Sequence, residues 1–435
     1  MLFDHQVGAG KTFLSVALVM EQKRMGLINK ALVLVPNHLC GQWSKAFMDA
    51  YPTSKLLVGD KINNKKDRKE FLYRARNGDF DAIIMKHSTF ENISVMETFE
   101  KSLLEDELNK LKKSLKQNKS HKDNVIKVKM RSLETKLTKK AKGKKFDNEI
   151  AFEDLGIDCL IVDEAHEFKN LYIDTAQYRV KGIPQTDSNK AMKMYCATQY
   201  IHQNNYKLYF LTGTPVSNSI AEFYTMQRYI QPQVLKDLGL EYFDDWQKVF
   251  TRIATSEELD FSGVNYTIVN RLSKFVNTPE LMMFYKQNTD IITREDIEKI
   301  SGKIVPNVKG GKAINVVVPR SDVVANFIGI EDEYGKYNEG SIIDRMNNWH
   351  KDPKRNNILV CTSEARKAAL DFRLINPQAE DYVESKLNIL AQKVMEHYND
   401  TRYKNNTQLI FCDLGVSKIN PQKVNVNEIA RLLKV

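Results

Sequence analysis

A glycine-rich loop at residues 5–12 restricts the possible folds of this chain more than any other part of its sequence. Its last residues, Gly8-Ala9-Gly10-Lys11-Thr12, fit the end of the phosphate-loop pattern G-x-x-x-x-G-K-[ST], while His5 stands at the first glycine position. In such loops glycines admit backbone N–H groups to a polyphosphate, the lysine neutralises outer phosphates, and the threonine hydroxyl binds Mg²⁺. The alternative is an ordinary glycine turn.

The residues after the loop have the periodicity of a helix. Phe13, Val16, Ala17 and Met20 recur at i, i+3, i+4 and i+7. A helix that begins here would place its positive N-terminal end at a bound anion, which favours the phosphate interpretation.

Four short apolar runs alternate with helical patterns in the first part of the chain. They lie at 31–35, 82–85, 159–162 and 208–211. Continuous apolar strands separated by helices are typical of a parallel sheet covered on both faces. The sequence therefore predicts an α/β fold, with ligands bound where the strands end.

The run at 159–162 leads directly into Asp163-Glu164-Ala165-His166. Two carboxylates at the tip of an apolar strand suit phosphoryl transfer, because one can hold Mg²⁺ and the other can orient or deprotonate the attacking water. The alternative is a solvated acidic strand end, and the phosphate loop upstream disfavours it. The run at 208–211 leads into Thr212-Gly213-Thr214-Pro215. The two threonine hydroxyls could relay the state of the nucleotide to a second site, and the alternative is that this segment is a simple turn.

Composition excludes some classes of protein. The apolar runs are too short to cross a bilayer and no secretory signal precedes them, so no membrane partner is expected. Five scattered cysteines without metal spacing indicate reduced thiols and a cytoplasmic location. The net charge of +10 suits a polyanionic partner.

The positive charge is concentrated in an insertion at about 95–148. Residues 101–145 hold 16 Lys and Arg against 5 Asp and Glu, a net charge of +11. Heptad-like apolar seams at 104–115 and 126–137 predict an antiparallel helical hairpin. We expect the hairpin to contact nucleic acid, while a solvated face or a protein partner remains an alternative. The lysines that crowd its return end include Lys136, Lys139 and Lys140.

Three of these motifs together resemble the ATPase core of helicase superfamily 2. They are Gly8 to Thr12, the DEAH sequence at 163–166, and Leu211 to Pro215. The longer string from Leu211 to Asn218, with Glu222-Phe223-Tyr224, resembles the Swi/Snf-type branch. More narrowly, residues 7–12, DEAHEFKN at 163–170 and RKAALD at 366–371 resemble the helicase portion of adenine-methylase–helicase fusion proteins from phages and other mobile elements.

The resemblance implies ATP and Mg²⁺ as cofactors. Phosphate binding would fall to the loop, with Lys11 also counted as catalytic, and Mg²⁺ would be held by Thr12 and Asp163. Glu164 would activate water. The full set expected around the nucleotide is Gly8, Ala9, Gly10, Lys11, Thr12, Asp163 and Glu164.

The resemblance also implies residues that face the nucleic acid, which we expect to be duplex DNA. His166, Thr212 and Thr214 would couple the state of ATP to it. Two turns, at 35–38 and 86–89, match positions that touch the sugar-phosphate backbone in relatives, with loop caps as the alternative. Their candidate contact residues are Pro36, Asn37, His38, His87 and Ser88.

We expect three segments along the chain. Residues 1–235 would form a RecA-like lobe, 236–380 a mostly helical connecting or clamp region with a strand at 314–318, and 381–435 the start of a second RecA-like lobe. In the last segment a helix over 385–398 leads to a strand at 408–412. Too few residues follow for a whole domain, so the second lobe is expected to be incomplete.

The resulting hypothesis is an ATP-binding fragment of a DNA-dependent ATPase, helicase or translocase, that couples hydrolysis to movement on DNA. An arginine finger from a full second lobe is worth a factor of about 10³–10⁵, so the isolated chain is expected to turn over slowly. A methylase or a second-lobe polypeptide is a candidate partner. The alternatives are an inactive DNA-binding module, a docking subunit that uses the basic hairpin, and a decayed gene fragment.

Overall fold

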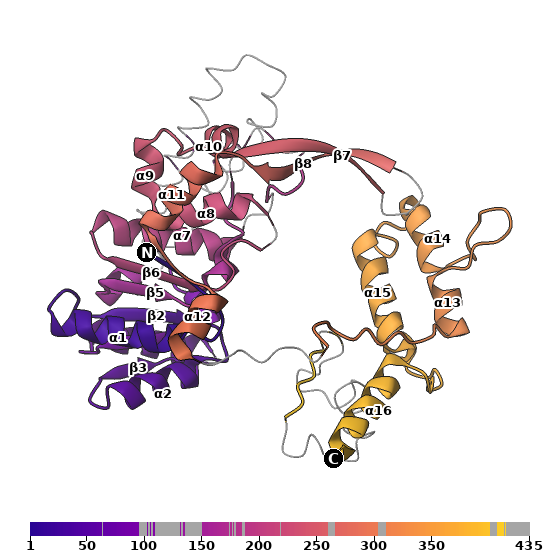
Figure 1. Cartoon of the computed structure of the whole chain (residues 1–435), viewed down its shortest axis with the longest axis horizontal. Coiled ribbons are helices and arrows are strands. Elements are labelled where there is room, and N and C mark those ends of the chain that lie inside the picture. Colours follow the sequence, from indigo (N-terminus) through magenta and orange to yellow (C-terminus); the bar gives the residue numbers. More distant parts are fainter. Residues whose placement is uncertain are drawn as a thin grey trace. The chain divides into compact units, whose positions relative to one another are not determined.

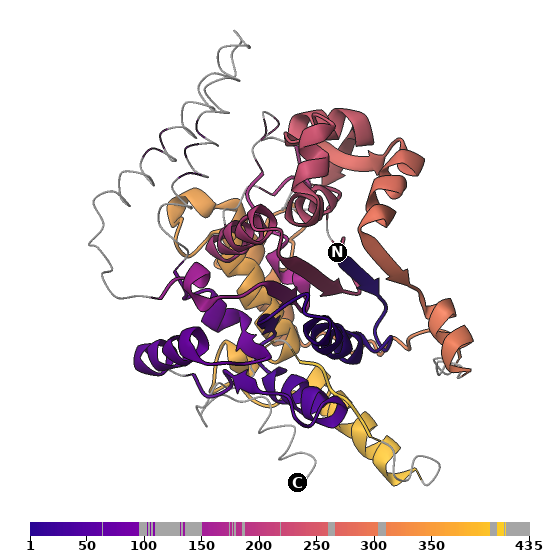
Figure 2. The same cartoon turned by 90° about the vertical axis from the view of Figure 1, so that its left-hand side faces the viewer.

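Seven parallel strands form the central sheet of this protein in a computed structural model of the chain (Figures 1 and 2). The structure describes residues 1–94 except 63, the isolated positions 102, 105, 108, 131 and 134, and residues 150–414 with short gaps. The gaps are 174, 176, 178–179, 185–187, 218, 260–265, 303–309, 401–406 and 413.

The strand order of the sheet is β3-β4-β2-β5-β6-β1-β9, and each adjacent pair is parallel. The inner strands β2 and β5 are buried along their whole length, as their continuous apolar sequences predicted. The α/β RecA-like fold is therefore confirmed. The strands are β1 (Leu2–His5), β2 (Ala31–Val35), β3 (Leu56–Val58), β4 (Ala82–Lys86), β5 (Cys159–Val162), β6 (Lys207–Thr212) and β9 (Thr289–Ile292).

Helices cover both faces of the sheet, and alternate residues of each strand pack on opposite faces. Along β2, Val33 belongs to the cluster that includes Trp43 of α2, while Leu32 and Leu34 belong to the cluster on the other face. The helices of this part are α1 (Lys11–Arg24), α2 (Cys40–Ala50), α3 (Lys65–Asn77), α4 (His87–Phe90), α7 (Asn189–Gln203), α8 (Ala221–Ile230), α9 (Pro232–Asp237), α10 (Phe243–Phe250), α11 (Thr278–Gln287) and α12 (Arg294–Ser301). Two 3₁₀ helices are η1 (Phe152–Leu155) and η2 (Ala165–Phe168).

The chain divides by contacts into two compact units. One unit comprises Met1–Ser256 and Ile268–Val305, and the other comprises Glu257–Thr267 and Pro306–Val435. The first unit extends past 235 because α10 packs its fully buried Trp246 against Phe223 of α8, and because β9 pairs with β1. The strands β7 (Thr251–Leu259) and β8 (Tyr266–Phe275) pair as a two-stranded sheet. Along the chain this sheet lies between α10 and α11.

The second unit is built from helices packed on α15. Contacts join α15 to α13 and α14, and the buried Arg345 ties α14 to α15 through Glu364 at 2.6 Å. Ser321, Ser341, Asn357 and Ser385 each cap the N-terminus of a helix. The elements are α13 (Asp322–Ile328), α14 (Ile342–Asn347), η3 (Trp349–Lys351), α15 (Ile358–Leu370), η4 (Phe372–Leu374) and α16 (Lys386–Asn399).

Two expected strands of the second unit do not form. Residues 314–318 and 408–412 have no regular structure, and Val317 and Phe411 are 90% and 89% exposed. A strand needs a neighbouring strand to satisfy its N–H and C=O groups, and neither run has one among the described residues. The helix expected at 385–398 is confirmed as α16, so this segment contains the helix of the expected second lobe without its strand.

The basic hairpin at about 95–148 lies outside the described residues except for five isolated positions, and its Lys136, Lys139 and Lys140 are not among these. In the part of the chain that the structure describes, no helix combines the length and apolar character needed to cross a membrane.

The fully buried Tyr229 offers a test of the helix packing behind the sheet. Its hydroxyl lies 3.0 Å from the carbonyl oxygens of both Phe168 and Ala191. Tyr229→Phe removes this donor from a buried site, so we expect the free energy of unfolding to fall by about 1–2 kcal/mol. Urea denaturation measures it, with Tyr73→Phe as the control because Tyr73 is 65% exposed. If both substitutions changed the free energy of unfolding equally, the stabilising role of the buried Tyr229 hydroxyl would be contradicted.

Candidate active site

The glycine-rich loop joins β1 to α1 in a conformation that needs glycine. Gly8 and Gly10 have φ angles of 93° and 81°, in the left-handed region that residues with a Cβ rarely adopt. Gly10 is the N-cap of α1, and no side chain caps that helix end. The first N–H groups of α1 therefore remain available to an anion, as the sequence predicted.

Lys11 lies back over the loop. Its Nζ atom donates hydrogen bonds to the carbonyl oxygens of His5 at 2.8 Å and Gln6 at 3.4 Å. These neutral acceptors hold the ammonium group next to the loop, where an anion would be a stronger partner.

His5 explains the departure from the usual loop pattern. The residue ends β1, its ring is fully buried, and its Nε2 atom lies 2.7 Å from Oδ2 of Asp290 in β9. The side chain is thus engaged with the neighbouring strand. Sequence reasoning missed Asp290, because 285 residues separate the partners and no local pattern marks such a pair.

Asp163 and Glu164 follow β5, which is separated from β1 by the single strand β6. Because parallel strands end at the same edge of a sheet, the carboxylates and the loop meet. Lys11, Thr12, Asp163 and Glu164 all line one cavity of about 580 Å³. Its wall on the α2 side includes Gln42 and Lys45. Of the residues predicted to surround the nucleotide, all but Ala9 are therefore brought together around this cavity.

The buried Asp163 carboxylate is held by two donors. Oδ1 accepts a hydrogen bond from the Glu164 N–H at 3.0 Å, and Oδ2 accepts one from Nε1 of Trp43, also at 3.0 Å. Burial raises the pKa of Asp163, and the Trp43 hydrogen bond and the charge of Lys11 oppose that rise. Sequence reasoning missed Trp43, because a tryptophan on an apolar helix face is read as core.

Glu164 begins a hydrogen-bonded chain that reaches β6. Its backbone is left-handed, with φ 49°, which is uncommon for a residue with a side chain. Its Oε2 atom lies 3.3 Å from Nδ1 of His166, and this hydrogen bond is the main reason that the pKa of Glu164 is lowered. The same His166 nitrogen lies 3.1 Å from Oγ1 of Thr212, which accepts a hydrogen bond from the Thr214 N–H.

The turn after β6 packs directly on the phosphate loop. A Cβ atom added to Gly213 would lie 3.0 Å from the carbonyl oxygen of His5, so the close approach needs glycine. Farther along, the buried Glu222 accepts a hydrogen bond from the Ser217 N–H at 2.7 Å and pairs with Lys169 at 3.2 Å. Glu222 therefore fixes the turn to η2, a role that its sequence signature did not reveal.

The two turns expected to face nucleic acid lie side by side. Oδ1 of Asn37, after β2, accepts hydrogen bonds from the hydroxyl and N–H of Ser88, after β4, at 2.8 and 3.3 Å. His38 is exposed beside them, while Pro36 is buried. The His87 ring points inward, with Nδ1 3.1 Å from Oε2 of Glu167. The His87 side chain is therefore engaged inside the protein, and its ring is not exposed to a nucleic acid.

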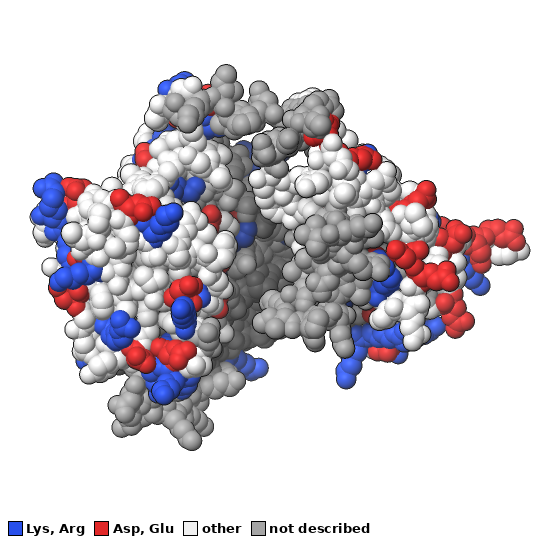
Figure 3. Space-filling model, turned by 90° about the horizontal axis from the view of Figure 1, so that it is seen from below, with Lys and Arg blue, Asp and Glu red and all other residues white. Residues whose placement is uncertain are grey.

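Charges on the face shown in Figure 3 are of both signs, and Lys and Arg side chains lie among Asp and Glu side chains over much of it. This agrees with the sequence, in which the net positive charge falls at 101–145.

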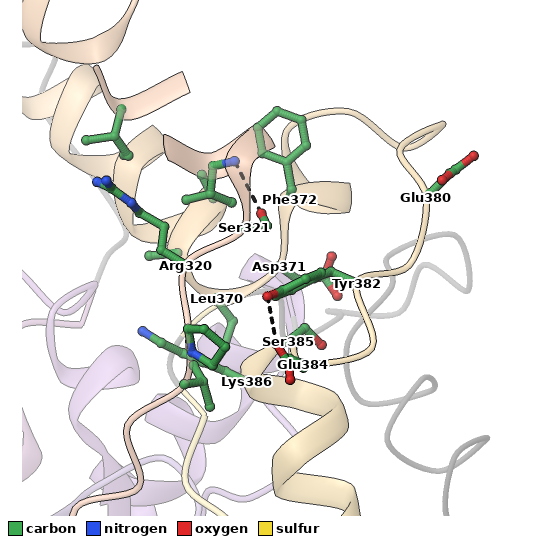
Figure 4. Close-up of a pocket in the computed structure, with 16 residues that line it drawn as sticks. Arg320, Ser321, Leu370, Asp371, Phe372, Glu380, Tyr382, Glu384, Ser385 and Lys386 are labelled. Carbon is green, nitrogen blue, oxygen red and sulfur yellow. Dashed lines mark hydrogen bonds between the residues drawn. The ribbon is translucent and has the colours of Figure 1, made fainter. Parts of the chain in front are cut away.

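A second cavity of about 260 Å³ lies within the other unit, beside α13, α15 and α16 (Figure 4). Its lining includes Arg320, Lys386 and Glu384, and Glu384 accepts a hydrogen bond from the Tyr382 hydroxyl at 3.0 Å. Asp371, also in the lining, pairs with Arg373 at 2.6 Å. These charged groups are of both signs, so the lining favours no single class of ligand.

His87 makes the stability of the first unit depend on pH. Burial lowers its pKa below the ordinary value of 6.5, against the opposing effect of Glu167. A lowered folded-state pKa contributes stability that is fully present above about pH 6.5 and lost as the pH falls through the lower folded value. We expect wild-type protein to lose more unfolding free energy than His87→Gln between pH 7.5 and 5.5 in urea denaturation. His38→Gln is the control, because His38 is exposed. If His87→Gln showed the same pH dependence of unfolding free energy as wild-type protein, the claim that burial lowers the pKa of His87 would be contradicted.

The chain matches one family of known proteins over its first 293 residues. Residues 1–293 match the family model described as a probable helicase domain. No curated protein matches the chain. Among solved structures it is similar to the Sulfolobus solfataricus SWI2/SNF2 ATPase core in complex with dsDNA, at 12% identity and a TM-score of 0.35, covering 91% of this chain and 59% of that chain.

The family match extends over more than half of the chain, from the phosphate loop through the carboxylate pair and the turn after β6 to β9. The chain therefore belongs to the probable helicase domain family.

Proposed function

We propose that this chain is the nucleotide-binding part of a DNA-dependent ATPase, which couples hydrolysis of Mg·ATP to movement on duplex DNA. The observation that carries the proposal is the convergence of Lys11, Thr12, Asp163 and Glu164 on one cavity. A lysine, a hydroxyl and two carboxylates around a glycine loop form the donor set for a nucleoside triphosphate with Mg²⁺.

The residues present fit a magnesium ion shared with phosphates. Asp163 is buried and lines the cavity, and among the described residues each of its carboxylate oxygens accepts one hydrogen bond from the protein. Among the described residues no group of three or more His, Cys, Asp or Glu could hold a metal by itself. This suits Mg²⁺, which binds through one or two carboxylates plus substrate phosphates. When bound, the ion would neutralise charge on the phosphates.

The roles of the other groups follow from their chemistry. Lys11 would exchange the loop carbonyls for the outer phosphates and stabilise the charge that develops there. Glu164 would orient the attacking water and accept its proton, since a carboxylate with a lowered pKa is ionised at neutral pH. His166 holds the Glu164 side chain in place.

Coupling to DNA would pass through the chain from Glu164 to Thr214. His166 contacts both the Glu164 carboxylate and the Thr212 hydroxyl, so a change at the nucleotide alters the support of the turn after β6. The exposed His38 and the paired Asn37 and Ser88 would contact the sugar-phosphate backbone of DNA. The basic segment at 101–145 would add electrostatic attraction.

A finer assignment rests on sequence resemblance. The DEAH sequence at 163–166 and the segment 366–371, which ends α15 and includes its C-cap Asp371, favour a Swi/Snf-like helicase portion of a mobile-element methylase–helicase fusion. A methylase or a second-lobe polypeptide is accordingly the proposed protein partner.

Lys11→Ala tests the proposed function. We expect the substitution to lower DNA-stimulated phosphate release from ATP by about a hundredfold or more, because it removes a charge that stabilises the transferring phosphoryl group. Lys23→Ala is the matched control, since Lys23 is the other lysine of α1 and lies outside the cavity lining. Turnover that survives in Lys11→Ala would refute the assignment. DNA binding without ATP turnover in wild-type protein would favour an inactive DNA-binding module.

Thr212→Val tests the coupling chain. The substitution removes the hydroxyl between His166 and Thr214 and conserves shape, so we expect ATP affinity to stay within about twofold while DNA stimulation of turnover falls by about tenfold. Thr198→Val is the control, because Thr198 is also fully buried but its hydroxyl bonds to Tyr195 in α7. Undiminished stimulation in Thr212→Val would remove the hydroxyl from the coupling pathway.

A further inference from the structure

The hydrogen bond between Trp43 and Asp163 joins a core side chain to the candidate metal site. Trp43 is fully buried in the first turn of α2, and its Nε1 atom lies 3.0 Å from Oδ2 of Asp163, which is 5% exposed. Both groups are therefore withdrawn from water. The indole N–H has a single hydrogen to donate, and here that hydrogen is directed at a carboxylate.

The indole ring has little freedom to move. It belongs to the apolar cluster that contains Val33 and Val35 of β2 and Phe47 of α2. Its backbone N–H bonds to the carbonyl oxygen of Leu39, at the start of the helix. A donor on a rigid, close-packed ring fixes its acceptor more tightly than a flexible side chain does.

Trp43 and the Glu164 N–H together fix the rotation of the carboxylate. Each donor bonds to a different oxygen of Asp163. Each oxygen can accept a second bond, so the carboxylate still has lone pairs for a metal or its water. Without the indole, only the Glu164 N–H would orient the Asp163 carboxylate. The χ2 torsion of an aspartate has a broad distribution, so one donor would leave the carboxylate free to rotate.

We propose that Trp43 is a positioning residue, whose indole N–H holds the Asp163 carboxylate in the orientation that receives the Mg²⁺ of bound ATP. This rests on the proposed function, because it assumes that Asp163 holds that ion.

A second buried tryptophan offers a control that distinguishes the positioning role of Trp43 from its contribution to core packing. Trp246 is also fully buried in the first unit, and its Nε1 atom donates to Oε1 of Gln227 at 2.8 Å. Neither residue lines the cavity. Trp43→Phe and Trp246→Phe therefore remove the same atoms and the same kind of hydrogen bond, and they differ in the acceptor that is left behind.

The test measures binding of a fluorescent ATP analogue as Mg²⁺ is titrated, together with its binding in EDTA. We expect Trp43→Phe to raise the half-saturating Mg²⁺ concentration by about tenfold, the usual effect of losing a partner of a metal ligand. Nucleotide affinity in EDTA should stay unchanged. Trp246→Phe should change neither quantity, although both variants should unfold more readily. In an Asp163→Asn background, Trp43→Phe should have no further effect on Mg²⁺ dependence.

A wild-type Mg²⁺ response in folded Trp43→Phe would overturn the proposal. Failure of the proposed function would look different, since wild-type protein would then bind no nucleotide or would bind it equally well after Lys11→Ala. If Trp43→Phe does not fold, 5-fluorotryptophan in the three tryptophans of the wild-type chain gives a second readout by ¹⁹F NMR. Mg²⁺ added to the ATP-bound protein should shift the Trp43 resonance and leave that of Trp246 in place, and an unmoved Trp43 resonance would refute the role.

Discussion

The hydrogen-bonded ladder of β1, β6 and β5 is the constraint on which the rest of the site depends. Phe210 of β6 is in register with Leu2 of β1 on one side and with Val162 of β5 on the other. This register brings three chain segments to one edge of the sheet, although more than 150 residues separate the loop from the carboxylates. A slip in either pairing would move Lys11 away from Asp163, whatever their own conformations.

Contacts between buried polar groups hold together the elements at this edge of the sheet. Asp163, His87 and Glu222 are each nearly or fully removed from water, and each is engaged by a partner from a different element. Buried polar groups without partners cost free energy, so these contacts specify one arrangement of the elements around the cavity. The same fixed arrangement would favour the proposed hydrolysis, because groups held in place need no reorganisation when charge develops in a reaction.

Four strands of the sheet could be predicted because their signals are local, whereas β1, β3 and β9 were not predicted. Strands β2, β4, β5 and β6 are continuous apolar runs, and each ends in a polar cluster. The runs at 314–318 and 408–412 have similar composition but remain without regular structure, since a strand depends on a partner that composition does not supply. Trp43 and Asp290 escaped prediction for a related reason. Trp43 donates to Asp163 and Asp290 pairs with His5. Both partners are distant in the sequence, so no spacing along the chain indicates these contacts.

The edge strand β9 shows how a distant segment can make an irregular motif workable. A histidine stands at the first glycine position of the loop pattern, and its ring is directed toward Asp290. The next residue is tied to the same strand, because the Gln6 N–H bonds to the carbonyl oxygen of Ile292 at 3.0 Å. The entry to the loop is therefore fixed by β9, and the glycines with left-handed backbone begin only at Gly8. This explains why the first unit must extend to β9, since the loop would otherwise lose the strand that positions its first two residues.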